Sequence, residues 1–126
     1  MRILIADDNE QVRNGVTSFL SADPTCEVCG EAASGEQAMQ MVRELAPDVV
    51  LLDVSMPGLS GLETARLLRP ELPNVKIIMM SQHDPVQLLP QALDAGADAC
   101  VDKCCVTTDL MPAIRSVTGN PEGIRI

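Results

Sequence analysis

One stretch indicates the fold class of this chain: Val49-Val-Leu-Leu-Asp-Val-Ser-Met-Pro-Gly58. Its first four residues show no polar alternation, which is typical of a parallel strand covered on both faces. Outward from it, short apolar runs alternate with segments of helical periodicity. The apolar runs are 2–7, 25–33, 75–80 and 99–102, and the helical segments are 10–21, 34–45, 60–70, 84–96 and 108–117. This alternation predicts a three-layer α/β fold, in which right-handed crossovers place helices on both faces of a five-stranded parallel sheet.

Capping residues predict where three of these helices begin. Ser34-Gly-Glu-Gln37 and Ser60-Gly-Leu-Glu63 both have the pattern of a capping box, in which the first and last residues satisfy each other's backbone N–H groups. Asp84 and Pro85 predict an N-cap and a first helical residue. Pro90 falls inside the same helix and removes a backbone hydrogen bond. We therefore expect that helix to be short, kinked or late-starting.

Length and composition exclude several classes of protein. The 126 residues suit one domain, and 46% hydrophobic with 21% charged residues excludes a disordered or fibrous chain. Eighteen acidic and nine basic residues give a net charge of −9, which argues against nucleic-acid binding. Phe19 is the only aromatic residue that could stack on a base. No apolar run could span a bilayer and the N-terminus lacks an export signal, so we expect a cytoplasmic protein without a membrane partner.

Five cysteines raise the question of disulfide, metal or redox chemistry. An odd number in a chain without an export signal argues against a disulfide framework. Cys26 and Cys29 have the spacing of a metal or redox pair, but they lie in a predicted strand, where residues three apart point to opposite faces. We therefore favour a structural role for this pair. Cys104 and Cys105 remain candidate reactive thiols, although no second ligand pair lies nearby in the sequence.

The carboxyl ends of the predicted strands gather polar residues, and ligands bind beyond these ends in open α/β sheets. The residues there are Asp7, Asp8, Asp53, Ser81 and Lys103. Each alone is commonly a turn former, a cap or a solvated charge. Two carboxylates about 4 Å apart, however, repel by roughly 4 kcal/mol at an effective dielectric of about 20. Three of them require protons, a cation or a neighbouring ammonium, and oxygen ligands of this kind suit Mg²⁺. A carboxylate beside Mg²⁺ and lysine could also accept a phosphoryl group.

These motifs resemble the receiver domain of bacterial two-component response regulators over nearly the whole chain. The acidic pair Asp7-Asp8, the segment Asp53-Val-Ser-Met-Pro-Gly-Leu-Ser-Gly61, Ser81 and Lys103 carry the resemblance, in the family's order. Because these four separated motifs agree, the resemblance is highly specific.

Two further segments, Val28-Cys-Gly-Glu-Ala-Ala-Ser-Gly-Glu-Gln37 and Gly96-Ala-Asp-Ala99, resemble the NarL/FixJ (LuxR-type) subfamily. The implied fold is flavodoxin-like, a (βα)5 sandwich with strand order 2-1-3-4-5. In that order the strands that carry Cys29 and Cys100 are opposite edges, about 19 Å apart. One metal site shared by the two cysteine groups is then excluded.

The resemblance implies a role for each member of the acidic cluster. Asp53 is implied to be the phosphorylated residue. Mg²⁺ is implied to bind Asp8, Asp53 and the backbone carbonyl of Ser55, with Asp7 helping through water. Lys103 is implied to pair with the acceptor and then with the phosphoryl group.

Three residues are implied to act after phosphorylation. Ser81 reorients its hydroxyl to the phosphoryl group, which couples the chemistry to a change in conformation. Ser55 and His83 occupy positions that can tune how fast water removes that group. For His83 alone, a solvated side chain is the more common reading.

The sequence departs from the family pattern three residues before Lys103, where an aromatic residue is usual and Cys100 stands instead. An aromatic switch is impossible there, and Pro90 distorts the same surface. The hypothesis is an altered coupling between phosphorylation and output, with possible redox sensitivity through Cys100, Cys104 or Cys105. The alternative, at least as favoured, is that Cys100 is a small buried apolar residue.

The resulting interpretation is a signalling switch, not an enzyme with an external substrate. A sensor histidine kinase would phosphorylate Asp53 with Mg²⁺ present, and the changed conformation would promote self-association and control an output. We expect residues 1–117 to form the receiver and residues 118–126 to form a linker. The subfamily resemblance implies a DNA-binding helix-turn-helix domain after that linker, outside the sequence, and hence transcription regulation.

Two alternatives remain. The first is a receiver used as a phosphorylation-independent interaction module, and the retained acidic cluster argues against it. The second is an enzyme on a similar sheet, either an aspartyl phosphatase or a flavin carrier. Ser55 stands where such phosphatases have a second Asp, and the chain offers neither a phosphate-cradling glycine loop after the first strand nor an aromatic residue to flank a flavin.

Overall fold

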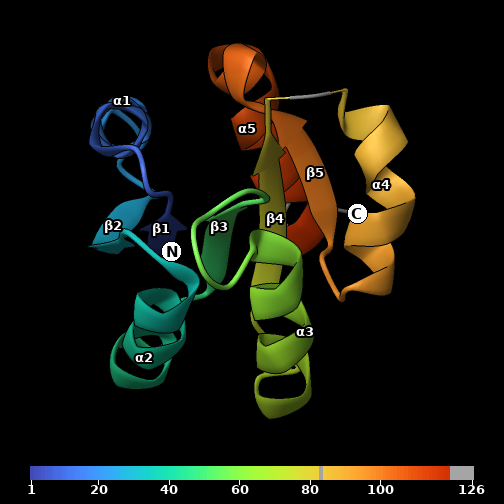
Figure 1. Cartoon of the computed structure of the whole chain (residues 1–126). Helices are drawn as coiled ribbons and strands as arrows, with labels where there is room; N and C mark the ends of the chain where they lie inside the picture. Colours follow the sequence, from blue (N-terminus) through green and yellow to red (C-terminus); the bar gives the residue numbers. More distant parts are fainter. Residues whose placement is uncertain (83, 120–126) are drawn as a thin grey trace.

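The computed structural model describes residues 1–82 and 84–119. Within these ranges, five strands form one sheet (Figure 1). The strands are β1 (Arg2–Ala6), β2 (Glu27–Ala32), β3 (Val49–Asp53), β4 (Lys76–Ser81) and β5 (Ala99–Asp102). The helices are α1 (Glu10–Ser21), α2 (Gly35–Leu45), α3 (Gly61–Glu71), α4 (Pro85–Asp94) and α5 (Val106–Thr118). Neighbouring strands are all parallel and follow the order β2-β1-β3-β4-β5, so the predicted flavodoxin-like order is confirmed.

The central strand β3 faces two hydrophobic cores, one on each side of the sheet. Val49 and Leu51 pack in the core under α1 and α5, whereas Val50 and Leu52 pack in the core under α2, α3 and α4. Figure 1 shows α1 and α5 above the sheet and α2 and α3 below it. All five residues of β3 are buried. Burial on both faces is the physical reason that this stretch lacks polar alternation.

The predicted helix starts are confirmed, but one capping box is only half formed. Ser60 Oγ accepts the Glu63 N–H at 3.2 Å, and the Glu63 carboxylate accepts the Ser60 N–H at 3.1 Å. Ser34 Oγ likewise accepts the Gln37 N–H at 3.1 Å. The Gln37 side-chain oxygen, however, accepts the Ala33 N–H at 2.7 Å rather than the Ser34 N–H. The predicted second hydrogen bond of that box is therefore wrong, because its donor is the N–H of Ala33, one residue before the expected donor.

Helix α4 begins where its cap predicts, despite the internal proline. Asp84 Oδ1 accepts the Val86 N–H at 2.9 Å, and Pro85 is the first helical residue. Of the three expected outcomes, a short helix is the one observed, with ten residues and no late start. Pro90 deprives the Val86 carbonyl of its helical donor, and Val86 is 74% exposed, so water can reach that turn.

Several helix ends differ from the prediction by one or two residues. Helix α3 continues to Glu71, one residue beyond Pro70, so this proline lies in the last turn and deprives only the Arg66 carbonyl of its helical donor. Helix α5 begins at Val106, two residues earlier than expected, because a 3₁₀ turn over Lys103–Cys105 leads into it. Gly119 ends α5 in the left-handed region, with φ of 67°. Most of the predicted linker, residues 120–126, lies outside the described residues. No helix within the described ranges has both the length and the apolar character needed to cross a membrane.

The strand geometry separates the cysteines, as predicted. Cys26 packs beside the α1/α5 core and Cys29 beside the opposite core. The β1–β2 register shifts between Ile3 and Leu4, and the Cys29 thiol lies 3.5 Å from the Ile3 carbonyl oxygen there. Cys100 lies in β5, at the other edge of the sheet. All five cysteines are free thiols, and no single site joins the two groups.

Candidate functional site

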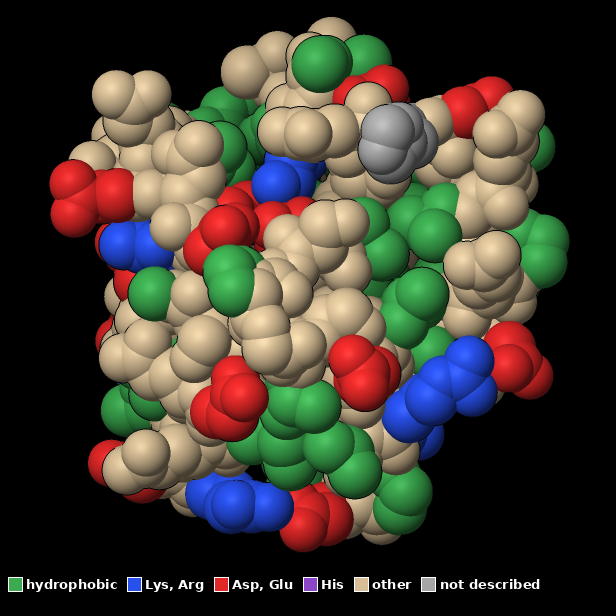
Figure 2. Space-filling view, in the orientation of Figure 1, with side chains coloured by type: hydrophobic (Ala, Val, Ile, Leu, Met, Phe, Trp, Pro, Cys, Tyr) green, Lys and Arg blue, Asp and Glu red, His purple; other side chains and the backbone are tan. Residues whose placement is uncertain are grey.

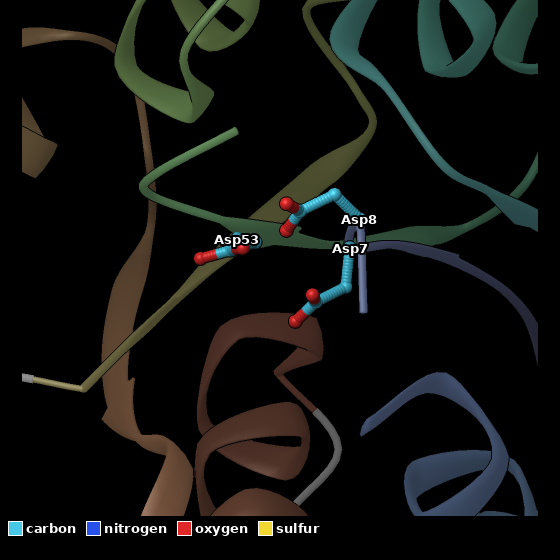
Figure 3. Close-up of side chains that lie close together, drawn as sticks. All are labelled: Asp7, Asp8 and Asp53. Atoms are coloured by element: carbon cyan, nitrogen blue, oxygen red, sulfur yellow. The ribbon is translucent and has the colours of Figure 1, made fainter. Parts of the chain in front are cut away.

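Three carboxylates meet at the carboxyl ends of β1 and β3. Ala6 pairs with Leu52 in the sheet, so the residues that follow, Asp7 and Asp53, lie side by side. Asp7, Asp8 and Asp53 can each present one carboxylate oxygen within 4.8 Å of the others. Figure 3 shows the three side chains directed toward a common space. The predicted acidic cluster is therefore present in the structure.

Asp7 and Asp8 are adjacent in sequence but differ completely in exposure. Asp7 is fully buried, whereas Asp8 is exposed. Asp7 Oδ1 accepts the Asn9 N–H at 2.9 Å, and the Asp7 N–H donates to the Ala32 carbonyl of β2 at 3.0 Å. These hydrogen bonds fix the position of Asp7 inside the site, while Asp8 faces solvent at the opening of the site.

Asp53 is buried at the end of β3, with 3% of the residue exposed. Its Oδ1 accepts the Ser55 N–H at 3.1 Å. Burial raises the pKa of Asp53 to about 6, and the neighbouring Asp7 charge adds to the rise, whereas the Ser55 N–H and Lys103 oppose it. The carboxylate is therefore mostly ionised at neutral pH, but it remains close enough to its pKa to respond to nearby charge.

Lys103 reaches the two buried carboxylates from the end of β5. Its Nζ lies 2.8 Å from Asp7 Oδ2 and 3.1 Å from Asp53 Oδ1, and the Lys103 side chain is only 10% exposed. Burial acts to lower the pKa of Lys103, but the contacts with Asp7 and Asp53 outweigh burial and the pKa is raised. The ammonium therefore stays charged and holds the two carboxylates together. Figure 2 shows acidic side chains beside a basic one in a hollow of this face.

The cluster fits a hard divalent cation. Three carboxylates face one ammonium, so the group carries an excess of negative charge. Among the described residues, buried Asp7 Oδ2 accepts no hydrogen bond of good geometry, although Lys103 Nζ is close. A cavity of about 260 Å³ lies over these side chains and is also lined by Ser55 and Gln82. The donors are all oxygens, which is the ligand class that Mg²⁺ prefers.

The loop between β3 and α3 is shaped by two glycines. Gly58 has a φ of 74°, in the left-handed region that favours glycine. A Cβ on Gly61 would overlap the backbone carbonyl of Asp53. Only a residue without a Cβ therefore fits at position 61 without moving the backbone of the loop. Ser55, in the same loop, is exposed beside the cavity.

The remaining predicted site residues lie on β4 and β5. Ser81 ends β4, is 1% exposed and pairs with Asp102 of β5, directly before Lys103. His83 lies outside the described residues. Cys100 is half-buried against the core below α4, and burial raises the pKa of its thiol. A raised pKa favours the unreactive protonated form, which supports the reading of Cys100 as an apolar residue.

Sequence reasoning missed two residues that hold Asp7. Asn9 provides its N–H to the Asp7 carboxylate and also caps α1, because its Oδ1 accepts the Gln11 N–H at 2.9 Å. An Asn just before a helical segment is a recognisable cap, so this signal was available. Arg13 Nη1 donates to the Asp7 carbonyl at 2.7 Å. No local pattern predicts that contact, because it depends on how α1 packs on β1 and β2.

Comparison with known proteins agrees with this geometry. The family described as "Response regulator receiver domain" matches residues 3–115. The chain belongs to the response regulator receiver family. The receiver domain is 40% identical over 117 residues to the transcriptional activator protein ExaE of Pseudomonas putida, covering 93% of this chain and 55% of that protein. It is 34% identical to the response regulator protein VraR of Staphylococcus saprophyticus, covering 95% of this chain and 57% of VraR. The receiver domain thus spans little more than half the length of these relatives.

Solved structures place this receiver domain beside LuxR-type and NarL-type regulators, as the sequence resemblance predicted. A LuxR-family two-component response regulator from Aurantimonas sp. SI85-9A1 superposes with a TM-score of 0.88 at 30% identity, covering 94% of this chain and 84% of that one. The signal receiver domain of the putative response regulator NarL from Mycobacterium tuberculosis gives a TM-score of 0.86 at 31% identity, covering 94% and 95%.

Proposed function

We propose that this receiver domain is a phosphoaccepting switch, in which Asp53 takes a phosphoryl group from the phosphohistidine of a sensor histidine kinase. The observation that carries the proposal is the buried group of Asp7, Asp53 and Lys103, with Lys103 Nζ 2.8 Å and 3.1 Å from the two carboxylates. Such a group is costly to bury, and a scaffold that served only for interaction would gain nothing from it.

Asp53 has the properties of the acceptor. An oxygen of the ionised carboxylate forms the new O–P bond while the N–P bond to the donor histidine breaks, and that histidine keeps the electron pair. A pKa of about 6 leaves most Asp53 side chains ionised at pH 7. Burial beside a fixed lysine also strengthens the electrostatic stabilisation of charge on the transferring group. The product is an aspartyl phosphate, so the domain acts as a signalling acceptor and not as an enzyme for an external substrate.

The cation of the site would be Mg²⁺, held by the carboxylates of Asp8 and Asp53 and the backbone carbonyl of Ser55, with Asp7 acting through water. When bound, Mg²⁺ would neutralise carboxylate charge and the oxygens of the phosphoryl group. The exposed position of Asp8 suits a ligand at the mouth of the site, and the burial of Asp7 suits a more distant role.

Lys103 and Ser81 would convert phosphorylation into a change of conformation. Lys103 already contacts Asp53 and would pair with the added phosphoryl group. Ser81, at the end of the neighbouring strand, would turn its hydroxyl toward that group. Ser55 at the edge of the cavity, and His83 two residues beyond Ser81, would then tune how fast water removes it.

The output is proposed from the relatives. ExaE is a transcriptional activator, and RcsB of Salmonella, 26% identical to this chain, has a structure bound to promoter rprA in the presence of the phosphomimetic BeF₃⁻. We assign residues 1–117 to the receiver and 118–126 to a linker toward a helix-turn-helix domain. Phosphorylation would promote self-association, and this domain, with a net charge of −9, would not itself contact DNA. The system would operate in the cytoplasm.

Intact-mass spectrometry after incubation with acetyl phosphate and Mg²⁺ tests the proposal. The wild-type chain should gain the mass of one phosphoryl group, and Asp53→Asn should gain none. Asp48→Asn is the matched control, because Asp48 lies just before the other end of β3 and should leave the gain intact. Incorporation that persists in Asp53→Asn would place the acceptor elsewhere. No incorporation by the wild type with any phosphodonor would instead favour the phosphorylation-independent interaction module.

A further inference from the structure

Arg13 lies on α1, outside the acidic cluster, yet it contacts the backbone of that cluster. Its Nη1 donates to the Asp7 carbonyl oxygen at 2.7 Å, and its side chain is only 14% exposed. A buried charge-assisted hydrogen bond to a backbone carbonyl is strong and directional. Arg13 therefore fixes the orientation of the peptide group between Asp7 and Asp8.

Arg13 is itself held by the edge strand β2. Its Nε lies 3.2 Å from Glu31 Oε1, and Glu31 Oε2 accepts the Thr17 hydroxyl at 3.1 Å. Because the guanidinium is planar, fixing Nε on Glu31 also fixes the direction in which Nη1 points. A continuous set of polar contacts thus runs from β2 through α1 to the Asp7 carbonyl.

Asp8 depends on this support more than its neighbour does. The Asp7 side chain is held by Asn9 and Lys103, but within the described residues no hydrogen bond or ion pair reaches the Asp8 carboxylate. The position of the Asp8 carboxylate is therefore set by the backbone that carries it. The planar peptide whose oxygen Arg13 binds is the one that begins Asp8.

We propose that Arg13, anchored by Glu31, is a positioning residue that sets the Asp7–Asp8 peptide and so aims Asp8 at the cation site shared with Asp53. This inference rests on the proposed function, because it concerns the Mg²⁺ site of that switch. It adds a requirement that the acidic cluster alone does not contain: correct packing of α1 and β2 around one arginine.

Isothermal titration of the whole chain with MgCl₂ tests the proposal. The decisive result is whether each of two variants binds Mg²⁺ more weakly or more tightly than the wild type. Arg13→Met should weaken Mg²⁺ binding about 10-fold, as loss of a partner that orients a metal ligand typically does. Glu31→Gln should weaken it in the same direction, by a smaller factor, because Arg13 loses its anchor. If Arg13 acted through its charge alone, the two variants would differ in sign: removing a cation would tighten Mg²⁺ binding and removing an anion would weaken it. Tighter or unchanged binding in Arg13→Met overturns the proposal.

Controls separate this outcome from a loss of folding or of the function itself. Arg43→Met and Glu71→Gln alter an exposed ion pair between α2 and α3, with side chains 55% and 49% exposed, and should leave Mg²⁺ affinity unchanged. In Arg13→Met, the rate of phosphorylation by acetyl phosphate should fall at low Mg²⁺ and return to the wild-type rate at saturating Mg²⁺. A rate that stays low at saturation contradicts a positioning role. If the wild type binds no Mg²⁺, the proposed function fails, whatever the variants do.

Discussion

The two ends of the sheet carry the same kinds of charged side chain but use them differently. At the carboxyl end, Lys103 contacts Asp7 and Asp53, and all three side chains are at most 10% exposed. At the amino end, the rim holds ion pairs such as Arg43–Glu71, whose side chains are about half exposed. The amino end also has the larger cavity, about 1390 Å³ against about 260 Å³. The smaller cavity nevertheless lies over the buried carboxylates and the buried ammonium.

Burial, not the number of charges or the size of a cavity, therefore distinguishes the end of the sheet at which we propose phosphorylation. Exposed pairs are screened by water and contribute little to stability. Buried charges that repel one another perturb pKa values and favour the binding of a counter-ion. Equivalent substitutions at the two ends should therefore have unequal effects, and the predictions below are given from the largest expected effect to the smallest.

Removing the lysine from each end should give the sharpest contrast. Lys103→Met leaves two buried carboxylates without their cation, so the free energy of unfolding should fall by about 3 kcal/mol in Mg²⁺-free buffer at pH 7. This loss of unfolding free energy is at the low end of the range for breaking a buried ion pair, because Asp53 can take up a proton. Lys76→Met, in the larger cavity, should change the free energy of unfolding by less than about 0.5 kcal/mol. Urea denaturation followed by circular dichroism measures both, and equal losses would remove the distinction between the two ends.

Neutralising an aspartate should have opposite signs at the two ends. Asp53→Asn should raise the free energy of unfolding by about 2 kcal/mol at pH 7 without Mg²⁺, because the buried carboxylate is held at a cost. Asp48 Oδ2 accepts the Arg2 N–H at 2.8 Å, so Asp48→Asn should instead lower it slightly.

The increase in unfolding free energy caused by Asp53→Asn should become larger as pH rises. The folded pKa of Asp53, about 6, lies above its ordinary value of 3.8. Between these values the folded state binds more protons than the unfolded state, so wild-type stability falls as pH rises. The advantage of Asp53→Asn should be absent near pH 4 and complete above about pH 6. Urea titrations at several pH values measure it, and an advantage that grows toward acid pH would contradict the assignment.

Mg²⁺ should stabilise the protein through one end only. With free Mg²⁺ at ten times its Kd, the wild type should gain about 1.4 kcal/mol in the free energy of unfolding. Asp8→Asn should lose most of that gain, whereas Glu71→Gln should retain it. Denaturation with and without MgCl₂ makes the comparison, and a gain that survives in Asp8→Asn would argue for a cation site elsewhere.

The smallest effect should come from the exposed pair at the amino end. Arg43→Met should cost about 0.5 kcal/mol at low salt, since both partners are about half exposed. The loss should vanish as salt is raised, because screening already weakens the pair in the wild type. A loss that salt does not change would indicate packing by the arginine stem instead of an ion pair.

Much of the fold could be predicted because it depends on short-range patterns. The run 49–52 indicated a strand covered on both faces, and the Ser60 and Asp84 caps located two helix starts. The errors occurred where local signals compete. Pro90 left a short, a kinked or a late-starting α4 open, and the Asp84 cap and Pro85 determined where that short helix begins. Gln37 matched a capping box, yet its side chain bonds one residue earlier than the motif implies.

The candidate site also has some features that the sequence predicts and others that depend on tertiary structure. The sequence indicated which polar residues follow each strand, and parallel pairing brings such residues to one edge. The residue pattern did not indicate that Asp7 is buried and Asp8 exposed, although the family resemblance implied different roles for them. Nor did it indicate Arg13, whose contacts join α1 to the edge strand β2 and to the backbone that follows β1.

The sequence by itself determined the order of strands and helices and the identity of the acids and the lysine at one rim, because hydrophobic periodicity and caps are encoded within a few residues. Tertiary structure alone decided how deeply each charge is buried, which atoms meet, and which arginine supports the loop. Those properties arise when segments distant in sequence exclude water from the same space, and that exclusion gives Asp53 its raised pKa.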